Sequence, residues 1–313
     1  MENSKIEWTK NTLQFWWGCD EVDGNPACDN CYARAWAERF GWDIWGHDKP
    51  RRPVGSAWKN VGKWQRKAAK AGRIDLVFTS SMSDIFEKSM PLITPTQVSG
   101  TPIIAETTGA LRDEFFGRIS KGHYPNLVFQ FLTKRPPNIM RMVPKAWHEN
   151  WPRNVWVGTS AGDQENVDRL VPHLLMVPAP VRFLSAEPLT ERIDISAYLI
   201  PHFAADDPRH YPRRDGLEQV IVGGESGGNA RPMHPDWVRD LRDQCQDYGT
   251  AFFFKQWGEW APNCLCGRPK PCRTTPRTGG KMGVMFRCGK KHAGRTLDAR
   301  TWDEIPQLEV ASA

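Results

Sequence analysis

Short apolar runs recur along the chain, and turn residues bound each of them. We interpret seven of these runs as β-strands, at positions 13–17, 74–80, 127–133, 154–160, 181–187, 219–225 and 251–257. Most of them are apolar at successive positions and do not alternate, which is typical of strands covered by helices in a parallel sheet. The pattern therefore predicts a buried parallel sheet.

Helical periodicity fills the intervals between these runs. Five segments carry apolar residues three to four positions apart, at 30–40, 56–72, 108–120, 163–176 and 234–249. Ser56 is expected to be the N-cap of the second segment, and Gly249 the residue that ends the last. Strands that alternate with helices indicate βα units joined by right-handed crossovers.

Polar residues follow nearly every apolar run. The stretches read SSMSD, TKRP, TSAGD, AEPLT, GGESGGNARP and KQWGEW. In a barrel the carboxyl ends of the strands surround one mouth, whereas an open doubly wound sheet gathers its ligand groups at one switch point. The spread over all strands favours an α/β fold with a (β/α) partial TIM-like barrel of about six to seven parallel strands.

Residues 1–260 are expected to form this barrel domain. From 261 to 313 the chain is rich in Gly, Pro and basic residues and shows almost no periodicity. We therefore expect an irregular C-terminal extension packed on the barrel.

Composition adds few constraints. The chain has 313 residues, of which 40% are apolar, and its formal net charge of +6 permits a phosphate-bearing partner without requiring one. Most of the fifteen tryptophans are expected to fill the core, while some could stack on bases or a flat cofactor. The polar start and the lack of a long apolar run predict a cytoplasmic protein with no membrane partner.

Three of the eight cysteines, Cys19, Cys28 and Cys31, gather directly after the first predicted strand as C-x8-C-x2-C. In a reducing compartment such clusters are metal ligands or reactive thiols more often than disulfides. The C-x2-C half brings two sulfurs together, and the eight-residue loop is long enough to return the third. No fourth ligand is evident nearby. The residues alone leave open an iron–sulfur cluster with an open iron, a zinc site or ordinary thiols.

With Tyr32 beside the last cysteine, the cluster resembles the radical S-adenosylmethionine (radical SAM) superfamily. More specifically, the chain resembles a phage-borne three-Cys-motif family of radical-SAM-like proteins. The resemblance extends over almost the whole chain, through the stretches IEWT, GC…CDNCYA, SSMSDIF, LTKRP, FLSAEPL, VIVGGESGGNARPMHPDWVRDLRDQC, FFFKQWGEW and GRTLDARTWDEIP.

The resemblance implies a radical-SAM-like partial barrel with a [4Fe–4S] cluster on Cys19, Cys28 and Cys31. It implies that S-adenosylmethionine chelates the fourth iron and is cleaved reductively to a 5′-deoxyadenosyl radical, with electrons from a donor such as flavodoxin or ferredoxin. Two features differ from the common superfamily pattern. The first gap between cysteines is eight residues instead of three, and the GGE at 223–225 follows the sixth apolar run instead of the second.

The residues expected to bind cofactor at the mouth are Tyr32, Ser81, Ser83, Lys134, Glu187, Gly223, Gly224, Glu225, Ser226, Arg231 and Gln256. Lys134 could pair with a carboxylate or phosphate. Glu187 could hold ribose hydroxyls, and the GGESGG loop could offer backbone N–H groups to an anion. Lys255 and Glu225 are the candidate catalytic residues, Lys255 because a lone buried ammonium is costly.

Four more cysteines lie in the extension. Cys264, Cys266, Cys272 and Cys288 form a candidate second metal site, for zinc or a second iron–sulfur cluster, with ordinary thiols as the alternative. Cys245 falls within a predicted helix and is expected to be an inert buried thiol.

The resulting hypothesis is a radical SAM enzyme, or a radical-SAM-like protein, of phage or prophage origin that modifies a nucleotide or nucleic acid. One alternative is an iron–sulfur or zinc protein that binds nucleic acid without catalysis. Another is a DNA-repair enzyme like the spore photoproduct lyases, which would need a duplex-binding surface that the sequence does not plainly show.

Overall fold

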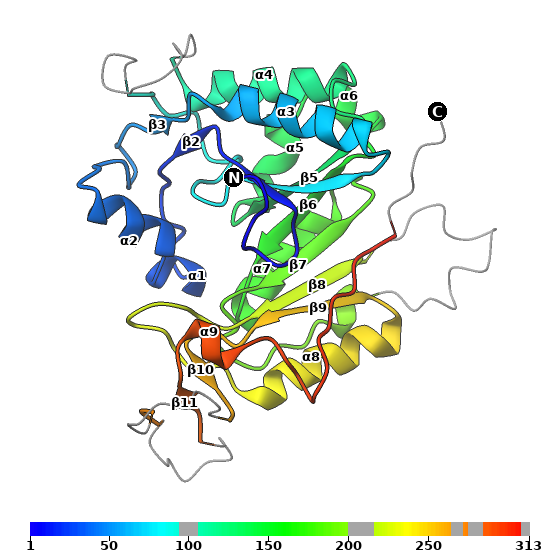
Figure 1. Ribbon diagram of the computed structural model, residues 1–313. Coiled ribbons are helices and arrows are strands. Elements are labelled where there is room, and N and C mark those ends of the chain that lie inside the picture. Colours follow the sequence, from blue (N-terminus) through cyan, green and yellow to red (C-terminus); the bar gives the residue numbers. More distant parts are fainter. Residues whose placement is uncertain (94–105, 200–215, 264–271, 275–283, 308–313) are drawn as a thin grey trace, which may run out of the picture.

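The computed structural model describes residues 1–93, 106–199, 216–263, 272–274 and 284–307. Its main sheet has seven strands in the order β1-β4-β5-β6-β7-β8-β9, all parallel (Figure 1). They are β1 (Asn11–Leu13), β4 (Asp75–Thr79), β5 (Leu127–Thr133), β6 (Val155–Ser160), β7 (Arg182–Ala186), β8 (Gln219–Gly223) and β9 (Ala251–Gln256). Each strand pairs with the strand of this sheet that comes next in the sequence. Within the described residues, the first strand β1 and the last strand β9 do not pair with each other. The sheet is therefore a half-barrel, which confirms the predicted α/β class and partial barrel.

Four long helices connect the strands. They are α3 (Ala57–Lys70), α4 (Thr108–Ser120), α7 (Gln164–Leu175) and α8 (Pro235–Tyr248). Their apolar sides share one core cluster with outward-facing strand residues, for example Val61 of α3 and Phe115 of α4 with Phe129 of β5. The helices thus cover the outer face of the half-barrel.

Shorter elements complete the fold. The helices are α1 (Pro26–Asp29), α2 (Tyr32–Arg39), η2 (Pro136–Asn138), α5 (Ile139–Met142), α6 (Ala146–Glu149), η3 (Ser196–Tyr198) and α9 (Lys290–Ala293). The strand pairs are β2 (Trp16–Trp17) with β3 (Arg52–Pro53), and β10 (Trp260–Ala261) with β11 (Phe286–Arg287).

The inner face of the sheet has its own apolar cluster. Phe78, Trp156, Phe183 and Phe253 point inward and pack with Trp8 of the amino-terminal segment, whose ring centroid lies 4.6 Å from that of Phe78. Side chains alternate between the two faces of a strand, so the residue two positions farther along also points inward. At these positions the inward residues are small or polar. These positions are held by Gly158, Ser185, Gly223 and Lys255. The inner face is therefore apolar at its middle and polar toward the carboxyl ends of the strands, which we call the mouth.

The predicted elements lie within two residues of the observed ones, with one exception. The single strand predicted for 13–17 was wrong, because β1 ends at Leu13 and Trp16–Trp17 pair with β3 instead. An apolar run cannot distinguish one strand from two here, since Leu13, Phe15 and Trp16 are all buried. Gly249 ends α8 in the left-handed conformation, with φ of 67°, as predicted. Ser56 precedes α3, but its side chain makes no capping hydrogen bond.

Residues after 260 contribute to the same core. Met285, Leu297 and Trp302 belong to the main apolar cluster, and the Trp302 ring lies 5.8 Å from that of Phe252. The described part of the predicted extension is thus packed on the barrel. Over the described ranges, no helix has the length and apolarity needed to cross a membrane.

We predict that Gly158→Ala destabilises the half-barrel. A Cβ at this position would lie 2.4 Å from the Phe183 ring, so the inner cluster would have to shift. Overpacking of this kind costs about 1–3 kcal/mol of the free energy of unfolding, which urea denaturation measures.

Gly117→Ala in α4 is the matched control, because nothing lies within 4 Å of its Cβ. Alanine is the better helix former, so this variant should gain about 0.5–1 kcal/mol. Equal denaturation midpoints for the two variants would contradict the close contact at Gly158.

Candidate functional site

Residues 18–31, which we call the cysteine loop, connect β2 to α2 and carry all three clustered thiols. The loop is shaped locally by Asn25, whose side chain caps α1 by accepting from the Ala27 N–H at 3.0 Å, and by Pro26 in the first helical turn. Cys28 lies in α1, and Cys31 is the residue that precedes α2. All three cysteines are half-buried. Figure 1 shows α1 and α2 to one side of the sheet.

The first anchor of the cysteine loop comes from the ends of β4 and β5. Arg135 donates through Nη1 to Asp84 Oδ2 at 3.0 Å and through Nη2 to the Asp20 carbonyl at 2.8 Å. Its Nη1 also lies 3.9 Å from Cys19 Sγ. Asp84 is buried and accepts two further bonds, from Thr133 Oγ1 and from the Lys134 N–H. The SSMSD and TKRP stretches thus hold the cysteine loop at Cys19.

A second anchor comes from the segment after β8. Arg231 donates through Nε and Nη2 to the two Glu225 oxygens, at 2.9 and 2.8 Å. The same guanidinium reaches Asp29 Oδ2 at 2.9 Å and the Pro26 carbonyl at 2.7 Å. Asn30 Nδ2 donates to Glu225 Oε1 at 3.1 Å. The GGESGGNARP stretch therefore holds α1, the part of the loop that contains Cys28.

Two asparagines and a tyrosine form further hydrogen bonds between the cysteine loop, or the start of α2, and the rest of the protein. Asn25 Nδ2 donates to the Ser160 carbonyl at the end of β6 at 3.0 Å, and Asn166 Nδ2 of α7 donates to the Gly24 carbonyl at 2.8 Å. The Tyr32 hydroxyl donates to the Ser81 carbonyl. The cysteine loop is consequently attached to the mouth at β4, β5, β6 and the segment after β8.

Burial governs the electrostatics of the thiols. It raises the pKa of Cys19 well above its ordinary value, Glu87 and Asp84 raise it further, and Arg135 and Lys134 oppose the shift. Burial also raises the pKa of Cys28, against the positive charge of Lys134. Both thiols therefore hold their protons at neutral pH, and a metal would have to displace them. Among the described residues, no group of three or more His, Cys, Asp or Glu side chains is arranged to hold a metal ion.

A charged pair lies at the mouth beyond the inner apolar cluster. Lys255 Nζ lies 2.7 Å from Glu187 Oε1, and the two side chains are only 17% and 15% exposed. Ser185 Oγ lies 3.4 Å from the other oxygen of Glu187. A Cβ on Gly223 would lie 2.4 Å from Glu187 Oε1, so a larger residue here would displace that carboxylate from its present position. Lys255 is thus paired, as its burial requires.

The remaining predicted site residues have mixed surroundings. The Lys134 side chain makes no hydrogen bond or ion pair with any described residue, and it acts on Cys28 through its charge. Ser81 and Ser83 contact the amide of Gln14. Gln256 donates to the Gly224 carbonyl at 2.9 Å and so joins β9 to the segment after β8.

Two of the predicted site residues make close contacts within the protein. Arg231 and Asn30 bond the two oxygens of Glu225, and the expected catalytic role of Glu225 stays a prediction. A Cβ on Gly224 would lie 2.0 Å from the Trp257 carbonyl, which explains this glycine by packing. Ser226 is half-buried beside them.

Sequence reasoning did not assign roles to Asn25, Asn30 and Asn166. Asn25 lies before a proline inside the cysteine pattern, which is a usable capping signal. Asn166 lies in an ordinary amphipathic helix and gives no signal of its own.

In the extension, Cys264 and Cys266 lie outside the described residues. Cys272 is half-buried and Cys288 is buried, so the second metal site stays a prediction. Cys245 is buried in α8, as predicted, and burial raises its pKa.

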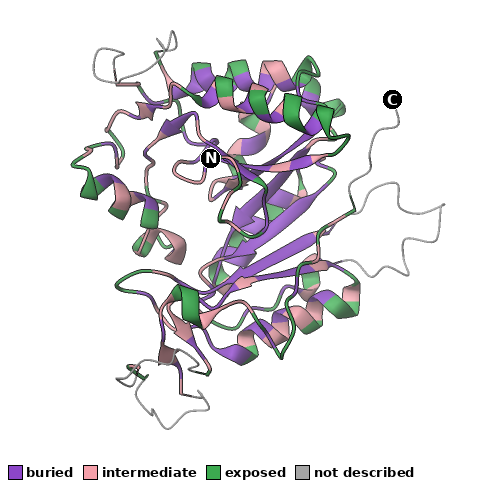
Figure 2. Ribbon diagram, in the orientation of Figure 1, coloured by how far each residue is buried: buried purple, intermediate pink, exposed green. Residues whose placement is uncertain are grey.

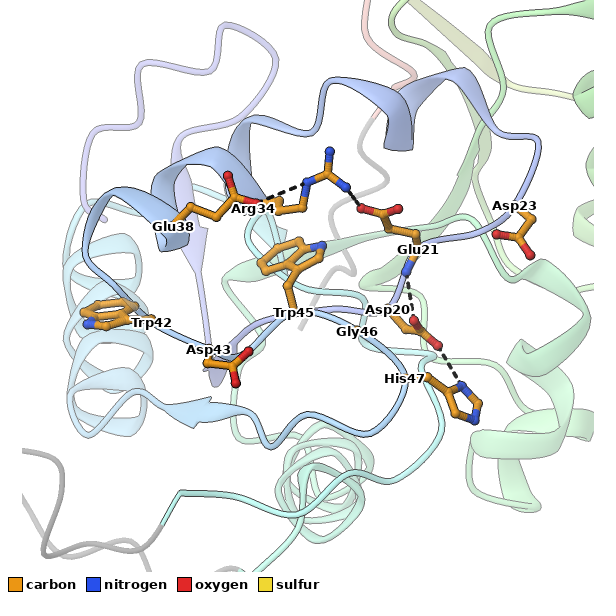
Figure 3. Close-up of a pocket in the computed structure, with 10 residues that line it drawn as sticks. All are labelled: Asp20, Glu21, Asp23, Arg34, Glu38, Trp42, Asp43, Trp45, Gly46 and His47. Atoms are coloured by element: carbon orange, nitrogen blue, oxygen red, sulfur yellow. Dashed lines mark hydrogen bonds and ion pairs between the residues drawn. The ribbon is translucent and has the colours of Figure 1, made fainter.

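Figure 3 shows a pocket of about 610 Å³ between the cysteine loop, α2 and residues 42–47. Its lining includes five carboxylates, from Asp20, Glu21, Asp23, Glu38 and Asp43. Arg34 pairs with Glu21 and, at 3.7 Å, with Glu38. None of the predicted site residues lines this pocket, and its acidic lining does not suit an anion.

Comparison with known proteins gives one match. No curated protein and no solved structure matches the chain at a significant level. A family model matches residues 3–306, nearly the full length. The chain therefore belongs to the family described as "Protein of unknown function (DUF5131)".

Proposed function

We propose that this protein is an iron–sulfur enzyme of the radical SAM type. In this proposal Cys19, Cys28 and Cys31 hold a [4Fe–4S] cluster whose fourth iron is open to S-adenosylmethionine. The observation that carries the proposal is the attachment of the cysteine loop to the mouth by Arg135, Arg231 and Asn25. This attachment supports a site in which the three thiols act together beside the inner face of the half-barrel.

The chemistry of the surrounding groups suits such a cluster. Three thiols on one loop are soft ligands that suit iron. They can ligate three of the four irons of a [4Fe–4S] cluster, which leaves the fourth iron without a protein ligand. Arg135 and Lys134 are the cations that act on Cys19, and they would offset part of the negative charge of ligated thiolates. Ligation would draw the three sulfurs toward one point.

The polar part of the mouth suits S-adenosylmethionine. Glu187 offers carboxylate oxygens to ribose hydroxyls or to an amino group, and Lys134 offers an unpaired ammonium to a carboxylate. Lys255 holds Glu187 in place, and Lys255 and Glu225 are the candidate catalytic residues. With one electron from a donor such as flavodoxin or ferredoxin, a bound cluster would supply reductive cleavage of S-adenosylmethionine to methionine and a 5′-deoxyadenosyl radical, which would abstract hydrogen from the substrate. A nucleotide or nucleic acid is the substrate class we propose.

We expect the triple variant in which Cys19, Cys28 and Cys31 are replaced by alanine to lose its iron and sulfide. The measurement is anaerobic reconstitution followed by iron and sulfide counts and the visible absorption spectrum. The wild-type chain should also yield 5′-deoxyadenosine when reduced with S-adenosylmethionine.

Cys245→Ala is the control, since it removes one thiol from the core of α8 and should leave the iron content unchanged. A triple variant that retained its full iron would refute the assignment of these cysteines. Zinc in place of iron in the wild-type chain would favour the non-catalytic alternative.

Arg231→Gln should loosen the cysteine loop. It removes the cation from Glu225, which is only 7% exposed, and it breaks the bonds of the same guanidinium to Asp29 and to the Pro26 carbonyl. We expect a chelator to remove iron from this variant several-fold faster than from the wild type.

Arg239→Gln is the matched control, because Arg239 also bonds two carboxylates, Asp236 and Asp298, on the exposed side of α8. It should lose iron at the wild-type rate. Equal rates for the two variants would mean that the anchor after β8 does not position the site.

Glu187→Gln should keep its iron but bind S-adenosylmethionine at least tenfold more weakly, a change of about 1.4 kcal/mol. The reason is that the neutral amide is a poorer acceptor for hydroxyl and ammonium groups. Equilibrium dialysis of the reconstituted protein measures the affinity, with Glu149→Gln on the exposed side of α6 as the control. An unchanged affinity would remove Glu187 from the site.

A further inference from the structure

The basic residues of the chain are unevenly distributed. Between positions 53 and 74 there are six cations, Lys59, Lys63, Arg66, Lys67, Lys70 and Arg73, and no carboxylate. This equals the whole formal net charge of +6, so the rest of the chain is balanced, with 36 basic and 36 acidic residues. The mild overall charge therefore conceals one strongly basic segment, which consists of α3 and Arg73, three residues after its end.

Five of these cations form a stripe along α3. At about 100° of rotation per residue, Lys59, Lys63, Arg66, Lys67 and Lys70 fall within an arc of about 100°. We call these five residues the basic stripe. All of them are exposed. The opposite side of the helix carries the buried Val61, Trp64 and Ala68, and Figure 2 shows buried and exposed bands along α3.

The stability of the helix does not account for the stripe. Lys63 lies four residues from both Lys59 and Lys67, and like charges at this spacing destabilise a helix. Lys67 and Lys70 in the last turn interact favourably with the helix dipole, but Lys59 in the first turn lies at the end where a cation is unfavourable.

Only part of the stripe is neutralised by the protein. Glu2 of the amino-terminal segment pairs with Lys63 Nζ at 2.7 Å and with Lys67. These two hydrogen bonds lower the pKa of Glu2 to about 2, so it is ionised at every physiological pH. Lys59, Arg66 and Lys70 make no hydrogen bond or ion pair with any residue that the structure describes. The stripe thus already binds one carboxylate across two lysines and has three further cations for an external anion.

We propose that the basic stripe binds the phosphate backbone of duplex nucleic acid. From Lys59 to Lys70 the helix rises about 16 Å, and duplex DNA carries one negative charge per roughly 1.7 Å of its axis, so several phosphates lie within reach of the stripe. The proposal uses no residue of the mouth and does not depend on the iron–sulfur function.

Other anionic partners fit less well. A helix that lies on a membrane inserts its apolar side, whereas the apolar side of α3 is buried in the core. Single-stranded nucleic acid is bound largely by stacking on exposed aromatic rings. The stripe has none, and the nearby Trp58 is covered by Arg118, whose guanidinium carbon lies 4.1 Å from the ring centroid.

The test compares the variant K59Q/R66Q/K70Q with the wild-type chain in binding to a fluorescent 30-base-pair DNA duplex of arbitrary sequence between about 50 and 200 mM salt. We expect at least a tenfold loss of affinity at 100 mM salt. Each phosphate contact contributes roughly 0.9 to the slope of log K against log salt. The loss of three cations should therefore make this slope shallower by about three. The control K145Q/K290Q/K291Q loses the same charge from other elements and should bind as the wild type does.

Glu2→Gln should raise the affinity for the duplex instead of lowering it. Because a loss of folding cannot raise affinity, this variant separates charge from misfolding. It frees Lys63 and Lys67, so the duplex should bind more tightly and the salt slope should steepen by about two. The proposal is overturned if the two triple variants bind equally, if Glu2→Gln binds no more tightly, or if phosphatidylserine vesicles bind the chain and the duplex does not. Iron content should be the same in all these variants, so failure of the cluster assignment and failure of this proposal are distinguishable.

Discussion

The site depends on two arginine–carboxylate pairs that join the cysteine loop to the half-barrel. Asp84 with Arg135 and Glu225 with Arg231 each place a nearly buried carboxylate at the mouth, and each arginine then reaches across to the loop. A buried carboxylate that loses its cation is strongly destabilising. The loop and the mouth therefore stabilise each other, and the planar guanidinium suits this because one side chain can bond a carboxylate and a carbonyl together.

The order of the strands explains why one loop can be attached at so many points. Each strand of the half-barrel pairs with the next, so all seven carboxyl ends lie along one edge. Segments at the ends of β4, β5, β6 and β8 contact residues 18–31. Trp8 closes the apolar middle of the inner face. What remains toward the mouth is small or polar, with Glu187 and Lys255 as its charged pair. Packing thus separates a region that stabilises the sheet from a region that is available for chemistry.

Much of this was predictable from the sequence, because parallel strands and amphipathic helices leave strong periodic signals. The positions of the site motifs were also predictable, since residues that follow strands in a barrel must meet at the mouth. Their roles were not. Glu225 and Arg231 look like ligand-binding groups in the sequence, but they bond each other and the loop, which only the fold brings near. Asn166 is one polar residue in a regular helix, and the first apolar run hides a break between two strands because both halves are buried.

The charge distribution changes how the composition should be interpreted. A net charge of +6 spread over the chain would support an anionic substrate at the mouth, but most of the excess lies on α3, on the outer face of the sheet. At the mouth, Arg135, Arg231 and Lys255 are already paired with carboxylates, and the adjacent pocket is acidic. The net charge is thus no argument for what the mouth binds. The anionic polymer that we propose for α3 and the cofactor that we propose for the mouth would therefore bind at separate surfaces, and each proposal is argued from its own local charges.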